Sequence, residues 1–135
     1  MTAISFNNAL GVHEHALGLR AKRAEVLANN LVNADTPNFK ARDFNFGDAL
    51  RAARAGRSGG AQLQRTHAKH FSTAVGVVDE ASLQFRVPMQ TSIDGNTVDP
   101  DIESAAFTQN ALDFAASFRL LNSRFSGLSK AISGE

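Results

Sequence analysis

The sequence predicts a mainly α-helical protein in which two long terminal helices pack as a coiled-coil-like core within an assembly, with a small irregular or β middle segment. Two observations support this fold class. Apolar residues recur at helical spacing near both ends of the 135-residue chain, and this spacing is lost in the middle. Such a stripe, sustained over many turns, is typical of a helix that packs along its whole length. The length of the chain favours a single domain, residues 1–135.

Residues 1–33 are expected to form the N-terminal helix. Its apolar stripe consists of residues that recur every seven positions, with two more in the neighbouring rows: Ala3, Leu10, Leu17, Ala24, Leu31, Phe6 and Leu27. His13 and Arg20 interrupt this stripe, so it is weaker than the one near the C-terminus. The helix should end near Asn33, because Pro37 disfavours the helical conformation at the residue before it.

The middle of the chain shows weaker patterns. Residues 34–46 are expected to form a turn and a short extended piece, and residues 47–98 a flexible or β segment. Within that segment, residues 51–60 have the composition of a basic, glycine-rich linker. Residues 75–78 and 83–87 are expected to be short strands that could pair as a hairpin. Residues 47–92 should therefore be the most exposed and mobile part of the protein.

The C-terminal helix is expected over residues 99–132, where the apolar stripe is most regular. Its members are separated by alternating steps of four and three residues: Phe107, Ala111, Phe114, Phe118, Leu121, Phe125, Leu128 and Ile132. Asp99 suits the N-cap, Pro100 the first helical position, and Gly134 the C-terminal stop. Such a helix would span about 50 Å, whereas a compact protein of this length has a diameter of about 37 Å. It must therefore pack on an equally long helix or on copies of itself.

Composition argues against several classes of protein. The formal net charge is +1, which gives no overall attraction to nucleic acid or to a membrane surface. The chain has no cysteine and therefore no disulfide, and no apolar run approaches the roughly 18 residues needed to cross a membrane. Residues 1–8 lack a basic region and a continuous apolar region, so no ordinary cleavable signal peptide is expected. The protein should either stay in the cytoplasm or leave by a route that needs no such signal.

Residues 28–40 form the most specific motif of the chain. They are a helix end that leads into a turn rich in side chains able to bond their own backbone. The run resembles the signature of the bacterial flagellar rod and hook axial protein family, and the residues that carry the resemblance are Asn29, Asn30, Asn33, Thr36, Pro37, Phe39 and Lys40. Shorter matches follow at residues 41–44, 65–70, 87–88 and 94–99. Asn38 and Phe39 stand where the family often has glycine and tyrosine, and asparagine is the next best residue for a left-handed backbone position.

The resemblance implies a structural role and a location. Members of this family are axial subunits that are exported unfolded through the flagellar type III apparatus without signal cleavage. They stack helically into a tube lined by their terminal helices. This chain would then be a subunit of the proximal rod of the basal body, in the periplasm, which transmits torque and encloses the export channel. Its partners would be copies of itself, other flagellar rod proteins, the basal adaptor protein and the type III export gate. The two apolar stripes would be the assembly seam.

Other functions find less support in the sequence. His13 and His15 would point to different sides of a helix, and His67 and His70 have no further zinc ligands nearby, so no metal site is expected. No nucleophile–base pattern or phosphate-binding loop is present, so neither catalysis nor a cofactor is expected.

Nucleic acid and lipid are not expected partners either. The arginines that could contact phosphates lie without interleaved aromatic residues: Arg42, Arg51, Arg54, Arg57 and Arg65. Another rod protein of the same family and a cytoplasmic helical-hairpin interaction module remain as alternatives.

Overall fold

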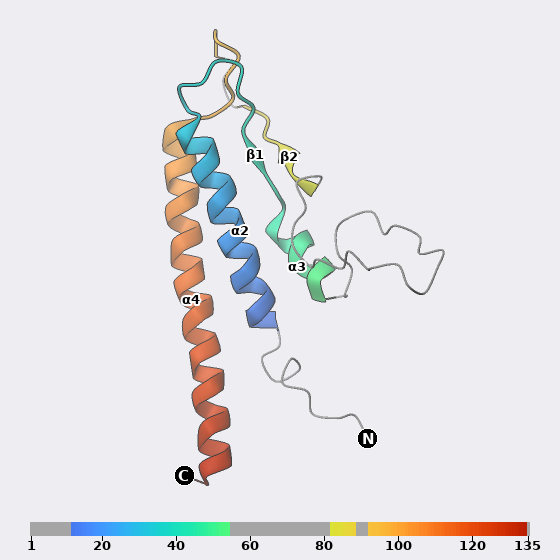
Figure 1. Ribbon diagram of the computed structural model, residues 1–135, viewed down its shortest axis with the longest axis vertical. Coiled ribbons are helices and arrows are strands. Elements are labelled where there is room, and N and C mark those ends of the chain that lie inside the picture. The colour runs from blue at the N-terminus through green and yellow to red at the C-terminus, as the bar shows by residue number, and fades with distance from the viewer. Residues whose placement is uncertain (1–11, 55–81, 89–91, 135) are drawn as a thin grey trace, which may run out of the picture.

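The computed structural model describes residues 12–54, 82–88 and 92–134, and Figure 1 shows their arrangement. The elements in chain order are α2 (Val12–Val32), β1 (Arg42–Asp43), α3 (Phe46–Arg54), β2 (Gln84–Phe85) and α4 (Pro100–Ser133). The structure is mainly helical and its two long helices pack together, which confirms the fold class predicted from the sequence. The first part of the predicted N-terminal helix, residues 1–11, lies outside the described residues.

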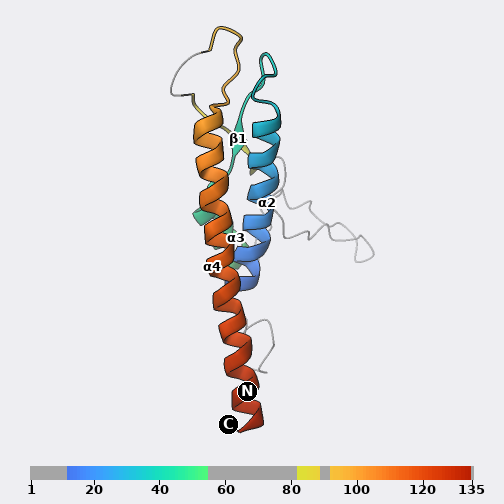
Figure 2. The same cartoon turned by 90° about the vertical axis from the view of Figure 1, so that its left-hand side faces the viewer.

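α2 and α4 form an antiparallel hairpin that sets the long axis of the molecule, and both views show them side by side (Figures 1 and 2). α4 has 34 residues and α2 has 21, so α4 continues well past Val12. The Asp99 side chain caps the start of α4, and Gly134, with a left-handed φ of 77°, ends it. Within the described part of the chain, no helix is both long and apolar enough to cross a membrane.

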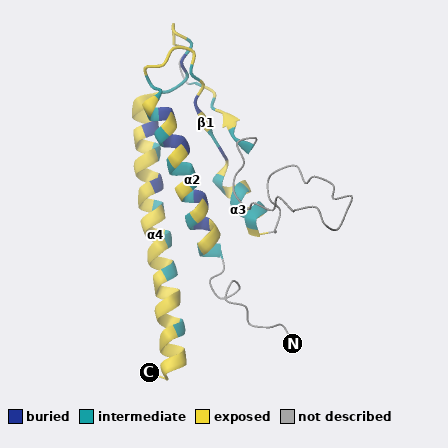
Figure 3. Ribbon diagram, in the orientation of Figure 1, coloured by how far each residue is buried: buried dark blue, intermediate teal, exposed yellow. Residues whose placement is uncertain are grey.

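The apolar core of the described residues is small. Its buried apolar residues come from α2 and from the chain around β1: Ala16, Leu19, Val26, Leu27, Ala41 and Phe44. Among the described residues of α4, only Glu103 and Asn110 are buried, and both are polar (Figure 3). The fully buried side chains that α4 contributes to its contact with α2 are therefore polar.

The middle of the chain differs from the sequence prediction at α3. Residues 51–54, the start of the predicted linker, are the last turn of this helix, and Phe46 begins the helix instead of ending an extended piece. The helix has local support: Asn45 Oδ1 accepts a hydrogen bond from the Asp48 N–H (3.2 Å), and Arg51 pairs with Asp48. The arginine and glycine content of residues 51–60 predicts a linker, because composition alone does not reveal these contacts.

β2 lies within the predicted strand 83–87, and its described partner is β1. β2 pairs antiparallel with β1, with Arg42 opposite Phe85 and Asp43 opposite Gln84. The predicted partner, residues 75–78, lies outside the described residues. Segments on either side of α3 are thus brought together, and β1 lies within the predicted extended piece.

Candidate functional site

The motif residues gather where α2 ends and the chain turns toward β1. Asn33 closes the end of the helix through its side chain. Its Nδ2 donates to the Asn29 carbonyl (2.8 Å) and to Asn29 Oδ1 (3.0 Å), and its Oδ1 accepts from Thr36 Oγ1 (3.2 Å). Asparagine and threonine at these positions therefore satisfy helix-end groups that would otherwise need water.

Pro37 and Asn38 are the central residues of the turn that follows. The Phe39 N–H donates to the Thr36 carbonyl (3.3 Å), and Asn38 has a positive φ of 60°. Proline followed by a residue with positive φ is the pattern of a type II turn. Gly95 approaches this turn closely, because a Cβ built on it would lie 2.7 Å from Asn38 Oδ1.

Beyond the turn, the chain runs alongside the segment that precedes α4. The Asn38 N–H donates to the Asp94 carbonyl (2.9 Å), and the Thr97 N–H donates to the Phe39 carbonyl (3.0 Å). The ammonium group of Lys40 donates to the carbonyl of the glycine that approaches the turn. The motif thus joins the end of one long helix to the start of the other.

Asn96 completes this junction, although sequence analysis did not single it out. Its Nδ2 lies within hydrogen-bond distance of three carbonyl oxygens at the end of α2, those of Asn33 (3.1 Å), Ala34 (2.6 Å) and Thr36 (3.0 Å). Its Oδ1 accepts from the Val98 N–H (2.8 Å), and the residue is buried. The signal was present in the sequence, since Asn96 lies in the matching stretch 94–99, but its role depends on contacts about 60 residues away.

Asn30 lies in α2 one turn before Asn33, and its side-chain amide also joins segments that are distant in sequence. Its Oδ1 accepts from the Arg42 N–H (3.1 Å), and its Nδ2 donates to the Arg42 carbonyl (2.8 Å) and to Glu103 Oε2 (3.2 Å). One buried amide therefore holds the backbone of β1 and contacts α4 at the same time. Its two groups satisfy a donor and an acceptor of one residue, as a neighbouring strand would do.

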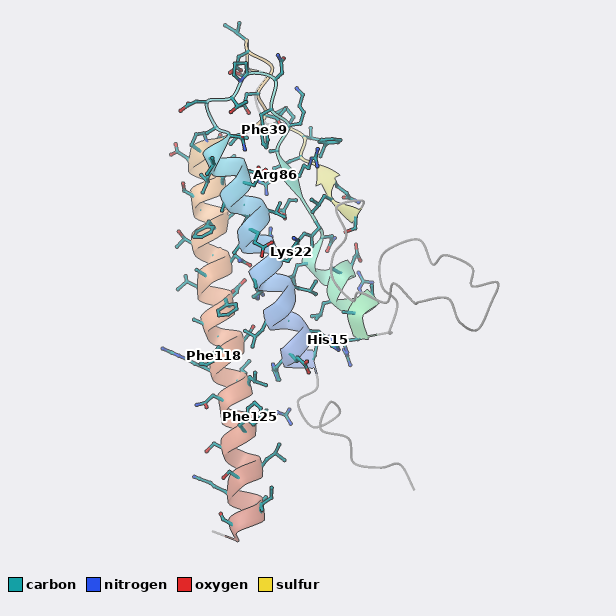
Figure 4. The ribbon with its side chains drawn as sticks, viewed as in Figure 1. His15, Lys22, Phe39, Arg86, Phe118 and Phe125 are labelled. Atoms are coloured by element: carbon teal, nitrogen blue, oxygen red, sulfur yellow. The ribbon has the colours of Figure 1, made fainter. Side chains whose placement is uncertain are left out.

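Four charged side chains, which we call the charge cluster, surround this contact: Arg23 of α2, Asp43 of β1, Arg86 after β2 and Glu103 of α4. Arg86 is labelled in Figure 4. Arg23 makes two hydrogen bonds to Asp43, of 3.1 and 2.8 Å. Arg86 bridges Asp43 (2.7 Å) and Glu103. The cluster links all four of these parts of the fold with alternating charges, so each carboxylate has a cationic partner.

The environment of Asp43 favours its ionised form. Burial alone would raise the pKa of this carboxyl, but hydrogen bonds from the Arg23 guanidinium and the Phe44 N–H, together with Arg86, outweigh burial and hold the pKa below its ordinary value of 3.8. The same bond to Asp43 raises the pKa of Arg23. Asp43 and Arg23 therefore face each other as an ion pair near neutral pH.

Arg20 explains the interruption of the stripe on α2. Its guanidinium pairs with Asp113 of α4 (2.8 Å) and lies 4.3 Å from the ring centre of Phe46 in α3. Asn110 Nδ2 donates to the Arg20 carbonyl (2.9 Å). A cation is thus placed where three helices meet, and it contacts both a carboxylate and an aromatic face.

The apolar stripe of α4 lies beside the face that contacts α2. The contacting face carries Glu103, Asn110 and Asp113, whereas the stripe leaves much of its aromatic surface exposed. Phe107 is 39% exposed, Phe118 57% and Ile132 86%. The remaining members are partly or largely exposed: Ala111, Phe114, Leu121, Phe125 and Leu128. Phe107, Phe118 and Ile132 therefore leave apolar surface that a neighbour could cover.

The α2 members of the predicted seam fall into three groups. Leu17 and Leu31 are half-buried, and Leu27 is fully buried within the subunit. Leu10 lies outside the described residues. Among the described α2 members of the seam, Leu17 and Leu31 are therefore the two that leave surface for an adjacent molecule to cover.

The histidines of α2 do not form a metal-binding group. His13 is half-buried and His15 exposed. Within residues 12–54, 82–88 and 92–134, no three histidine, cysteine, aspartate or glutamate side chains are placed to hold a metal ion. His67 and His70 lie outside these residues, as do Arg57 and Arg65.

Comparison with known proteins relates this architecture to one family. A family model described as flagella basal body rod protein matches residues 10–40, which include the whole motif. A flagellar basal body rod protein FlgB of Aeromonas hydrophila is 47% identical over 137 aligned residues, which cover 98% of both chains.

More distant relatives carry the same name. A FlgB of Cereibacter sphaeroides is 45% identical, with 96% of this chain and 98% of the relative covered. A FlgB of Salmonella typhimurium is 39% identical, with 93% and 94% covered. The similarity therefore extends over the junction, the charge cluster and both long helices.

Proposed function

Because the chain belongs to the family of flagellar basal body rod proteins named FlgB, and so is a structural subunit of the basal body rod, we propose that it joins the rod through the apolar stripes of α4 and α2. The observation that carries this proposal is the exposure of the α4 stripe beside a polar contact face. Apolar patches of this extent on a single chain are typical of surfaces that bind another protein.

The energetics favour association along the stripe. Full burial of a phenylalanine side chain contributes about 1.5–3 kcal/mol, and Phe107, Phe114, Phe118 and Phe125 are all at least 38% exposed. Two carboxylates of the contacting face already have partners on α2, since Glu103 contacts Asn30 and Asp113 contacts Arg20. A neighbour can therefore cover the stripe without disturbing the contact between α2 and α4.

In this proposal the neighbours are copies of the chain and other flagellar rod proteins, with the basal adaptor protein and the export gate at the base. The stacked subunits form the proximal part of a tube that transmits torque and encloses the export channel. The protein reaches this place in the periplasm through the type III apparatus, without a cleaved signal. Its role is structural and not catalytic.

The junction supplies the geometry for this assembly. The hydrogen bonds of Asn96 and Asn30 fix the direction in which the chain leaves α2 and the position of β1 against both helices. In an assembly of repeated subunits, the same local direction recurs at every copy. A small error at the junction would therefore displace the middle segment throughout the structure.

The test is to replace an exposed member of the stripe by a charged residue. Phe118→Asp should be synthesised and exported but should give no rod and no motility, because it would place an unpaired charge in a packed interface. Arg54→Asp, on the exposed end of α3, is the control and should be tolerated. Normal swimming of the Phe118→Asp strain would show that this stripe is not an assembly surface.

A further inference from the structure

The two ends of the hairpin carry opposite charge. At the junction end, the exposed acidic residues are Asp35, Asp94, Asp99 and Asp101. The exposed cation there, Lys40, donates to a backbone carbonyl of the same end. We call this surface the acidic end. Figures 1 and 2 place it opposite the C-terminus along the long axis.

The last part of α4, residues 118–133, is positively charged. We call it the α4 tail. It contains Arg119, Arg124 and Lys130 and no acidic residue, and all three cations are exposed. None of the ion pairs formed among the described residues involves them. The tail also carries Phe118 and Ile132, which are 57% and 86% exposed. It is therefore a helix surface that combines apolar groups with an excess of positive charge.

The acidic end also carries exposed apolar side chains. Val32 is 84% exposed at the end of α2, and Ile93 is fully exposed in the loop before α4. Each end of the molecule thus presents aliphatic or aromatic surface next to charges of one sign. Surfaces with complementary potentials attract one another and fix a relative orientation.

We propose that the α4 tail is a docking surface for the acidic end of another rod subunit, built like the acidic end of this chain, so that subunits stack end to end along the hairpin axis. The proposal rests on the proposed function and deepens it, because it assigns a partner surface to one part of the α4 stripe. Lateral neighbours would cover the rest of the stripe. The charges give the stacking its polarity, since two tails or two acidic ends repel each other.

The first experiment reverses charge on the tail. In a strain that lacks the native protein, Arg124→Glu with Lys130→Glu should lower the amount in purified basal bodies at least tenfold, while the exported amount stays unchanged. The matched control is Arg54→Glu with Arg57→Glu, two arginines of the basic, glycine-rich segment 51–60, which makes the same change in net charge and should stay within twofold of wild type. Equal incorporation of the two variants would overturn the proposal.

A second variant separates docking from helix stability, because acidic residues near a helix C-terminus weaken the helix itself. Arg124→Gln with Lys130→Gln removes the charge without this effect, and it should still lower incorporation by several-fold. Incorporation of the glutamine variant at the wild-type level would overturn a docking role for these charges.

The second experiment identifies the surface that covers the tail. The chain has no cysteine, so Ser129→Cys introduces a single thiol for a photo-activated cross-linker. Mass spectrometry of cross-linked basal bodies should recover the peptide that precedes the C-terminal helix of a neighbouring rod subunit. A cross-link to the side of a neighbour's helix, to residues 1–11 of the same chain, or to no subunit would each contradict the proposal. A cross-link to a helix side, with Phe118→Asp still excluded from the rod, would leave the proposed function intact.

Discussion

Single amide side chains hold the junction together. Asn30 and Asn96 each combine a donor and an acceptor, and each bonds backbone groups from a segment distant in sequence. Aspartate would supply acceptors only, and leucine would supply neither group. The motif therefore needs asparagine at position 30 for a chemical reason, since both the N–H and the carbonyl of Arg42 bind to it.

Asn30→Ala should destabilise the isolated protein by about 2 kcal/mol, because it leaves backbone groups of Arg42 and one Glu103 oxygen without this partner. The free energy of unfolding in urea, followed by circular dichroism, measures the loss. Asn29→Ala, at an exposed position of the same motif, is the control and should cost about 0.5 kcal/mol. Equal losses of stability in the two variants would mean that the buried amide of Asn30 does not hold the junction together.

Asp43 should make the stability of the hairpin depend on acid pH. Its pKa is lowered in the folded state, so its contribution is fully present well above the unfolded value of 3.8 and is lost as the pH falls through the lower folded value. Asp43→Asn should therefore be less stable at pH 7, by about 2 kcal/mol.

The free energy of unfolding of Asp43→Asn should depend less on pH in the acid range than that of the wild-type protein. Urea unfolding of both proteins between neutral pH and pH 3 tests this, and the difference in stability should shrink toward the acid end. A difference that stays constant with pH would show that ionisation of Asp43 contributes nothing.

Among the elements, the long helices were the easiest to predict. The regular stripe and the sequence Asp99-Pro100 locate α4, and Pro37 locates the end of α2. These signals are local, because capping and periodicity depend on neighbours within about one turn. The location of the motif turn, including a left-handed residue at Asn38, could be predicted for the same reason.

The contacts between elements could not be predicted in the same way. Glu103 looks like an ordinary first-turn acid, but it is buried against Asn30, 73 residues away. Arg86 has no local pattern, and its partners Asp43 and Glu103 lie in separate elements. Such pairings depend on the fold as a whole. Periodicity also does not reveal that the fully buried side chains of α4 are the polar Glu103 and Asn110, which lie outside the apolar stripe.

Pro37→Ala should loosen the turn between α2 and β1. Proline fixes the backbone of the first central position, and its removal should cost about 0.4–1 kcal/mol and favour continuation of the helix. We expect less protein in purified basal bodies while synthesis and export stay normal. Asn38→Gly is the control, since glycine also adopts a positive φ. Wild-type incorporation would contradict a geometric role, and a block in export would point to recognition by the secretion apparatus.

At the scale of the whole molecule, stability should be uneven along α4. Residues 100–117 contact α2 through Asn110, Asp113 and the charge cluster, whereas most of the α4 tail is exposed. A helix segment without a partner is marginally stable in water.

Amide hydrogen exchange should reveal this difference. In the isolated protein, amides of residues 122–133 should exchange at least tenfold faster than those of residues 103–113. In purified basal bodies the two groups should be protected to a similar degree, because neighbours cover the tail. Equal protection in the isolated protein would show that the tail is stable alone.

The close approach of Gly95 to Asn38 has a consequence for how these two positions change together in evolution. Both have positive φ, and a Cβ at position 95 would lie 2.7 Å from the Asn38 side chain. A relative with glycine in place of Asn38 would have free space there, and asparagine or aspartate could then replace Gly95. Relatives that keep asparagine at the first position should keep glycine at the second. The two positions should therefore covary, with at most one of them carrying a side chain.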